Sequence, residues 1–77
     1  MPRYFFSTAN GHYINDEEGD LLADDSAARA MAVDILSEIL PSQREQLCDG
    51  GRYSIFVASE DHAEIYEITA TARRIGN

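Results

Sequence analysis

Two hairpin patterns rich in aromatic residues flank one amphipathic helix, and this order restricts the chain to a small α+β fold. The strand patterns are rich in Tyr, Phe, Ile and Val, which suit a pleated and partly buried surface. Asn10-Gly11 after the first strand is a favoured pair for a two-residue type I′ turn, because both central positions need a positive φ. The predicted strands are residues 3–9, 12–14, 52–58 and 63–71.

The predicted helix covers residues 26–40 and has signals at both ends. Asp24, Asp25 and Ser26 can accept hydrogen bonds from its first N–H groups, and the two carboxylates suit the positive end of the helix. Pro41 cannot continue the helical hydrogen bonding, so the helix should end before it. One face of the segment is apolar and is expected to pack on the sheet; it consists of Ala28, Met31, Ala32, Ile35, Leu36, Ile39 and Leu40.

The handedness of chain connections predicts how the strands are ordered. A right-handed crossover from the second strand through the helix places the third strand beside the first. We therefore expect an α+β fold of ββαββ type, with a four-stranded antiparallel sheet in the order 2-1-3-4 and one helix packed on one face. Glu64 and Glu67 fit the fourth strand as an edge strand, because charges there discourage unwanted pairing.

The length of 77 residues predicts a single domain over residues 1–77, with residues 72–77 as a loose tail. A domain of this size has little room for a deep active-site cleft. The size therefore favours binding over catalysis.

The charge of the chain limits the class of partner. The net charge is −8, and the six basic residues are all arginine. Nucleic-acid binding requires clustered cations that neutralise phosphates, and only Arg73 and Arg74 are adjacent. We therefore expect neither nucleic acid nor a membrane as a partner. A basic protein, or a second copy of the chain, is the partner that charge and small size favour.

Cysteine usage and hydropathy bear on the location of the protein. Cys48 is the only cysteine, which excludes an intrachain disulfide and a zinc site made of thiolates. No apolar run approaches the length of a membrane span, and the first residues lack the pattern of a secretory signal. These features lead us to expect a cytoplasmic protein.

The two central strands have apolar residues on both faces. Alternation puts Tyr4 and Phe6 on one face of the first strand, and Arg3, Phe5 and Ser7 on the other. The third strand divides in the same way, with Phe56 on the second face. One helix can bury only one face, so apolar area should remain on the open side. Either the 41–51 connection or the tail covers this area, or it forms a protein interface.

Acidic residues are concentrated before the helix. Six of the ten residues from 16 to 25 are acidic, namely Asp16, Glu17, Glu18, Asp20, Asp24 and Asp25. The segment can be a solvated hairpin exit with a helix cap, a surface for a basic partner, or a Ca²⁺ or Mg²⁺ site made of oxygen ligands. It does not fit the EF-hand loop, because Leu21 stands where the glycine should be.

No catalytic signature is visible, so we expect a protein that is not an enzyme and has no cofactor. There is no glycine-rich phosphate loop, no Gly-x-Ser-x-Gly elbow and no Cys-x-x-Cys. His12 and His62 lie at predicted turns near opposite edges of the sheet, which argues against a shared site. Cys48 has no neighbouring base or positive charge in the sequence that would activate its thiol.

Three motifs resemble a known family of small uncharacterised proteobacterial domains. They are the opening Met-Pro-Arg-Tyr-Phe-Phe, the turn Asp16-Glu17-Glu18-Gly19, and the helix start Ala27-Ala28-Arg29. Members typically open M-P-R-[YF]-[YF]-F, continue to a D-x-E-G turn, and have a helix beginning A-A-R. They often have a tryptophan near the position of Cys48 and a shorter tail. The resemblance implies a stand-alone bacterial domain, and it assigns no catalytic role to any residue.

These observations lead to one main hypothesis. We expect a non-enzymatic domain for protein–protein interaction, which binds through the open sheet face and the acidic turn; a regulatory role is compatible with this expectation. The alternative is a protein that binds divalent cations through residues 16–25. The candidate interaction residues are Arg3, Phe5, Phe56, Asp16, Glu17, Glu18 and Asp20.

Overall fold

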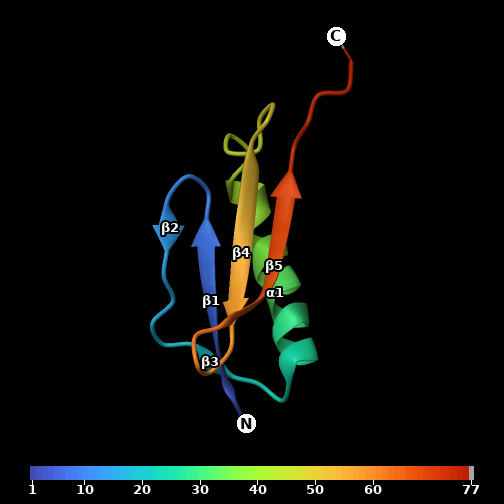
Figure 1. The fold of residues 1–77 in the computed structure, drawn as a ribbon. Helices are drawn as coiled ribbons and strands as arrows, with labels where there is room; N and C mark the ends of the chain where they lie inside the picture. Colours follow the sequence, from blue (N-terminus) through green and yellow to red (C-terminus); the bar gives the residue numbers. More distant parts are fainter. Residues whose placement is uncertain (77) are drawn as a thin grey trace.

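A computed structural model describes residues 1–76 and shows one helix against an antiparallel β-sheet (Figure 1). The prediction of an α+β fold with one helix and an antiparallel sheet is therefore confirmed. The elements are β1 (Arg3–Ala9), β2 (Tyr13–Ile14), β3 (Asp20–Leu21), α1 (Asp25–Ile39), a 3-10 turn (Leu40–Ser42), β4 (Arg52–Ala58) and β5 (Glu64–Thr71).

The predicted count of four strands is wrong, and the order differs from 2-1-3-4 because an extra strand, β3, enters the numbering; the four predicted strands keep their expected neighbours. The sheet has five strands, with the order β2-β1-β4-β5 and with β3 paired to β1 outside this path. The outer edge of β1 is shared by two short strands, since β2 pairs with Thr8 and Ala9 while β3 pairs with Arg3 and Tyr4. The extra strand forms because the chain leaves β2, bends away from β1 over residues 15–19, and then continues in the same direction to pair with the other end of β1. A two-residue strand has too little alternation to stand out in a sequence.

The first hairpin loop also differs from the prediction. Ala9 pairs with Tyr13, so the loop has three residues, Asn10 to His12, instead of the two of a type I′ turn. Gly11 has a φ of 105°, and Asn10 has no positive φ. The side chain of Asn10 instead accepts a hydrogen bond from the His12 N–H at 3.3 Å, which stabilises the longer loop.

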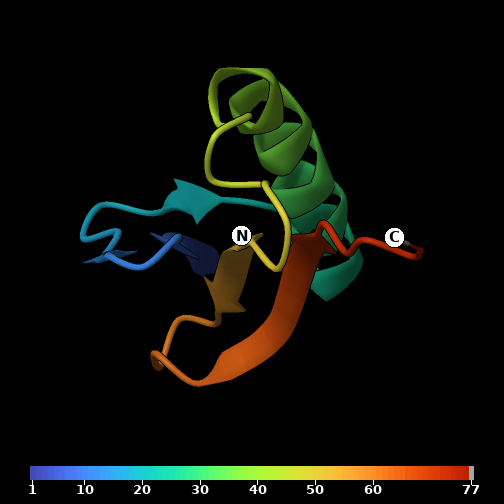
Figure 2. The same cartoon turned by 90° about the horizontal axis from the view of Figure 1, so that it is seen from above.

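The helix begins at Asp25 and ends at Ile39, close to the predicted 26–40. Asp24 is the N-cap, and its Oδ1 accepts a hydrogen bond from the Ala27 N–H at 2.8 Å. Pro41 lies in the 3-10 turn that follows. Figure 2 shows α1 on one side of the curved sheet, where it contacts mainly β4. The buried core between these layers consists of Tyr4, Phe6, Ala28, Ala32, Leu36, Tyr53, Ile55 and Val57.

The strand alternation separates a helix-facing side from an open face. Ile55 and Val57 are fully buried beneath the helix. The open face is the opposite side of the sheet, and its central part is formed by Phe5, Ser7, Ser54, Phe56 and Ala58. The register places Ser7 beside Phe56 and Phe5 beside Ala58 on this face.

A β-bulge interrupts the pairing of β4 with β5. Val57 pairs with Tyr66, but the next residue, Ala58, pairs with Glu64, so Ile65 is the extra residue. Glu67 pairs with Phe56 and therefore lies on the open face. Because a bulge shifts the alternation by one residue, Glu64 lies on this same face although it is three positions from Glu67.

Residues 72–76 follow β5 without forming a helix or a strand. Ala72 is still held by backbone hydrogen bonds to Gly50 and Gly51, and the residues after it extend away from the body of the fold (Figure 1). Arg74 lies 3.5 Å from a carboxylate oxygen of Asp49, and both side chains are exposed. Asn77, the last residue of the predicted tail, lies outside the described residues. Within residues 1–76, no helix has the length and apolarity needed to cross a membrane.

Candidate functional site

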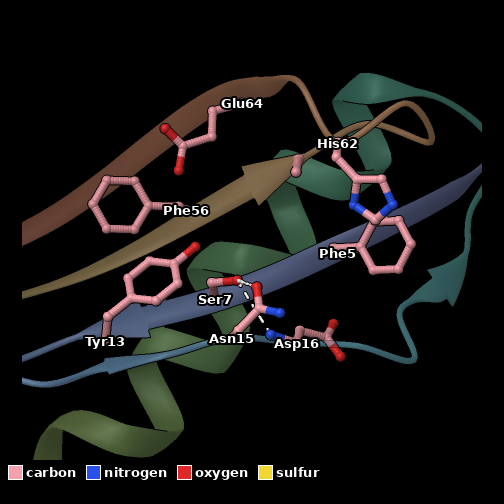
Figure 3. Close-up of a pocket in the computed structure, with 9 residues that line it drawn as sticks. Phe5, Ser7, Tyr13, Asn15, Asp16, Phe56, His62 and Glu64 are labelled. Carbon is pink, nitrogen blue, oxygen red and sulfur yellow. Dashed lines mark hydrogen bonds between the residues drawn. The ribbon is translucent and has the colours of Figure 1, made fainter.

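A hollow of about 380 Å³ lies on the open face, over the end of the sheet where β4 passes into β5 (Figure 3). This volume is at the lower end of the range of small-molecule sites, about 300–1,000 Å³. Ser7 and Ala58 form its floor. The aromatic side chains that line it are Phe5, Tyr13, Phe56 and His62, and the polar ones are Asn15, Asp16 and Glu64.

One end of the hollow is formed by Tyr13 and Phe56. Their ring centroids are 6.2 Å apart, with an angle of 44° between the planes. Tyr13 reaches the open face because β2 pairs it with Ala9, and its side chain is 57% exposed. Phe56 is half-buried. The two rings therefore present aromatic surface to the hollow from strands on either side of β1.

The other end is formed by Phe5 and His62, whose rings stack with centroids 4.5 Å apart and an interplanar angle of 22°. The stack leaves Phe5 only 8% exposed. Phe5, one of the candidate interaction residues, is therefore covered, and its part in an interaction stays a prediction. The covering group belongs to the β4–β5 turn, and not to the 41–51 connection or the tail. His62 lies over β1, an inner strand, and not at the sheet edge where it was expected.

The β4–β5 turn holds His62 in this position. The His62 N–H donates to the Ser59 carbonyl at 2.8 Å, and the Ser59 N–H donates to the Ala63 carbonyl at 2.9 Å. The carboxylate of Asp61 accepts hydrogen bonds from the Ser59 hydroxyl and the Ala63 N–H, which lower its pKa. His62 itself has a φ of 65°, a left-handed conformation that is unusual for a residue with a side chain.

Asp16 lines the hollow and also has a structural role. Its Oδ2 accepts a hydrogen bond from the Phe6 N–H at 2.9 Å, and its Oδ1 accepts from the N–H groups of Gly19 and Glu18 at 3.1 and 3.2 Å. Partial burial alone would raise the pKa of the Asp16 carboxyl, but these three hydrogen bonds outweigh it and lower the pKa. Asp16 thus occupies the gap between β2 and β3. There its carboxylate accepts a hydrogen bond from the Phe6 N–H of β1, which pairs with neither β2 nor β3.

Two further contacts attach the acidic turn to β1. Nη1 of Arg3 donates a hydrogen bond to the Glu18 carbonyl at 2.7 Å. The guanidinium of Arg3, a predicted interaction residue, therefore stabilises the acidic turn. Gly19 has a φ of 70°, and a Cβ at this position would lie 2.5 Å from the Tyr4 carbonyl oxygen. The turn can therefore approach β1 this closely only with glycine.

The floor is polar beside Phe56. The Ser7 hydroxyl, which is 5% exposed as a residue, accepts a hydrogen bond from the Asp16 N–H at 3.2 Å. It lies 3.4 Å from Oδ1 of Asn15, to which it donates. Figure 3 shows this hydrogen-bonded group at the centre of the hollow, between the two aromatic pairs.

The two acids at the start of the helix also have structural roles. Asp24 caps the helix, and Oδ1 of Asp25 accepts a hydrogen bond from the Tyr4 hydroxyl at 2.7 Å. This hydrogen bond, together with burial and the charge of Asp25, raises the pKa of Tyr4 to about 12. Three of the six clustered acids thus accept hydrogen bonds within the fold, whereas the carboxylates of Glu17, Glu18 and Asp20 accept none from the described residues and are exposed.

The acidic segment does not converge on one point. Among residues 1–76, no three His, Cys, Asp or Glu side chains are grouped so that they could hold a metal ion. The hydrogen-bonded carboxylates point to β1, to the helix start and to Tyr4. The geometry therefore gives no support to the predicted cation site.

Glu64 is a lining residue that sequence reasoning missed. Strict alternation along residues 63–71 places it on the face opposite to Glu67, and the bulge brings it to the open face. Figure 3 shows its carboxylate directed toward the hollow, beside Phe56. Tyr13 was missed as well, although its place in a strand after a glycine turn was a signal that its side chain should face one side of the sheet.

Comparison with known proteins gives one match. The model of a family described as "Domain of unknown function (DUF6894)" matches residues 3–71. The matched stretch begins with the first residue of β1 and ends with the last residue of β5, so it includes every helix and strand described above. No curated protein and no solved structure matches the chain.

Proposed function

The chain belongs to the family of small domains described as DUF6894, and we propose that it is a non-enzymatic interaction domain that binds a basic segment of a partner protein. The binding surface is the open face with the acidic turn beside it. The proposal also keeps three predictions about the protein: that it is bacterial, that it shares the motif pattern of the family it resembles, and that it is cytoplasmic.

The observation that carries the proposal is the hollow on the open face. The helix covers the other side of the sheet, whereas Phe56 is half-buried and Tyr13 is 57% exposed at this side. Aromatic side chains that remain accessible in a recess, with polar groups around them, are typical of protein interaction sites. The hollow is small and open, which suits a side chain of a partner better than a whole metabolite.

Charge supports a basic partner. The chain has a net charge of −8, and Asp16 and Glu64 line the hollow. Glu17, Glu18 and Asp20 are exposed on the adjacent turn. Their field would attract a positively charged segment and increase the rate of association at low ionic strength.

The polar groups of the hollow support binding over catalysis. Ser7 is the lining hydroxyl at the floor, and its hydrogen-bond partners are the Asn15 side chain and the Asp16 N–H. Neither partner is a base that could activate the hydroxyl as a nucleophile. His62 is stacked on Phe5 at the end of the hollow, where its ring serves as a wall.

Affinity capture from extract of the native host tests the proposal. Phe56→Ser removes the central ring of the surface, and Val33→Ser is the matched control, because Val33 is 42% exposed on the helix. We expect wild type and Val33→Ser to retain the same partner and Phe56→Ser to lose it. Circular dichroism confirms that the variants are folded. Retention by Phe56→Ser would refute the open face as the binding surface.

A second variant tests the acidic turn. Glu17→Gln, Glu18→Gln and Asp20→Asn together remove three negative charges, while Asp16 stays because it stabilises the fold. We expect the triple variant to bind the partner with a slower association rate and a weaker dependence on salt. The same proteins in size-exclusion chromatography with light scattering show whether the partner is a second copy, since a dimer would dissociate with Phe56→Ser.

A further inference from the structure

We propose that the hollow on the open face is a receptor for the guanidinium group of an arginine side chain, presented by the basic partner. The inference rests on the proposed function and specifies which chemical group of the partner enters the site. It follows from the shape of the walls, the charge of the rim and the hydrogen-bonding character of the floor.

The walls suit a flat cation. Tyr13 and Phe56 form one end and leave ring surface accessible to a cation, whereas at the other end His62 covers Phe5, so His62 alone presents its ring there (Figure 3). The negative faces of aromatic rings attract a cation that lies against them. A guanidinium is planar and weakly hydrated, so it stacks on such rings more readily than the compact, strongly hydrated ammonium of lysine does.

The rim supplies the opposite charge. The carboxylate of Glu64 is directed toward the hollow beside Phe56, because the bulge at Val57 and Ala58 turns it to the open face. A carboxylate accepts two parallel hydrogen bonds from a guanidinium, a geometry that lysine cannot reproduce. Asp16 adds a second negative charge from the other side of the hollow, where three backbone N–H groups hold it in place.

The other polar groups are acceptors or can act as acceptors. The side-chain oxygens of Ser7, Tyr13 and Asn15 lie along the lining with the two carboxylates. Arginine has five N–H donors and no acceptor, so this set of groups matches it. Among the described residues that line the hollow, none is an arginine or a lysine, so no permanently charged side chain of the chain itself neutralises Asp16 and Glu64 there.

The test is a titration of the ¹⁵N-labelled protein, followed by NMR, with three capped tripeptides that differ in the central residue. Acetyl-Gly-Arg-Gly-amide is the probe. The citrulline tripeptide has the same shape without charge, and the lysine tripeptide has the charge without the planar group. At millimolar peptide we expect the arginine probe to shift the amide signals of Ser7, Phe56 and Glu64, with affinity at least about fivefold above that of either control.

Two variants identify the carboxylate. Glu64→Gln removes the charge at the hollow, and Glu67→Gln removes a charge from the same strand and face outside the lining. We expect Glu64→Gln to weaken binding of the arginine probe by at least about fivefold and Glu67→Gln by less than about twofold. Equal binding of the arginine and citrulline probes, equal effects of the two variants, or no shift at the hollow would each overturn the inference.

The outcome can be separated from that of the proposed function. If the captured partner binds Glu64→Gln as well as wild type but does not bind Phe56→Ser, the interaction domain stands and the arginine site is wrong. If the arginine probe binds as expected while no partner depends on Phe56, the site is supported and the protein-binding function is refuted.

Discussion

The imidazole ring of His62 stacks on the phenyl ring of Phe5, with centroids 4.5 Å apart and planes inclined by 22°. This contact joins the β4–β5 turn to the inner strand β1 and reduces the exposure of Phe5 to 8%. The stacked pair therefore forms one end of the hollow on the open face. Phe5 thereby becomes a supporting residue of the site, and Phe56 with Tyr13 provides the accessible aromatic surface.

The left-handed backbone conformation of His62 should produce a difference in the free energy of unfolding between His62→Ala and His62→Gly. Its φ of 65° is unfavourable for any residue with a Cβ and costs about 1 kcal/mol. His62→Ala removes the stack and keeps this cost, whereas His62→Gly removes both. We expect His62→Gly to be more stable than His62→Ala by about 1 kcal/mol in urea unfolding. Equal stabilities would show that the turn relaxes away from the left-handed conformation.

Gly19 should tolerate substitution much less well than Gly11. Both have a positive φ, but a Cβ on Gly19 would overlap the Tyr4 carbonyl oxygen at 2.5 Å, while a Cβ on Gly11 would meet nothing within 4 Å. Gly11→Ala should cost about 1–2 kcal/mol from backbone strain alone. Gly19→Ala should cost roughly a further 1–3 kcal/mol, because the acidic turn must move away from β1. Thermal unfolding of the two variants measures the difference, and equal losses would contradict the close approach.

Asp16 should make stability depend on acidic pH. Its pKa in the folded protein is below the ordinary value of 3.8, so its stabilising contribution is complete above that value and decreases as pH falls through the lowered pKa. Asp16→Asn leaves an N–H of the acidic turn or of Phe6 without its acceptor, which costs about 1–3 kcal/mol at neutral pH. In urea unfolding from pH 7 to pH 2, the wild type should lose its advantage over Asp16→Asn below about pH 4. A constant difference would contradict the role of the carboxylate.

Tyr4 should have the opposite dependence at alkaline pH. Its hydroxyl donates to Asp25, and its pKa is raised from 10.0 to about 12 in the folded protein. Ionisation is thus easier in the unfolded chain, so the contribution of Tyr4 to stability is complete below pH 10.0 and is lost as pH rises toward 12. Tyr4→Phe removes this titration. The free energy of unfolding of wild type should therefore fall more steeply than that of the variant above pH 10.0, and parallel curves would refute the shift.

The six clustered acids should divide into two classes by their effect on stability. Asp24→Ala removes the N-cap and should cost about 1 kcal/mol. Neutralising the exposed acids Glu17, Glu18 and Asp20 should change stability by less than about 0.5 kcal/mol per residue, and repulsion within a chain of charge −8 favours a gain. Chemical unfolding of the Asp24→Ala and triple variants checks this. A large loss in the triple variant would show that the exposed acids also have structural partners.

The elements with long regular patterns were predictable from the sequence. The bounds 3–9 and 52–58 are those of β1 and β4, and the helix starts within one residue of the prediction. The division of these two strands into a core face and an open face also follows from alternation. Such features depend on residues that are close together in the chain, so neighbouring side chains carry the signal.

The site depended on contacts between distant segments. The sequence indicated an aromatic open face and an acidic turn, and it made Phe5 and Asp16 candidate interaction residues, but it left open whether Phe5 is covered and whether the acidic turn has only a structural role. The stack with His62 and the hydrogen bond to the Phe6 N–H give both residues structural roles. Whether a side chain remains accessible is decided by the segment that folds over it, and local pattern does not identify that segment.

The sequence by itself determined the helix, the two long inner strands and the excess of negative charge, because periodicity, capping and composition are local properties of the chain. The tertiary structure alone decided that β3 pairs with β1, that Asp16 fills the gap beside it, and that one extra residue in β5 turns Glu64 toward the open face. Each of these depends on which distant backbone groups find hydrogen-bond partners, and a shift of one residue in pairing reverses the face on which a side chain lies.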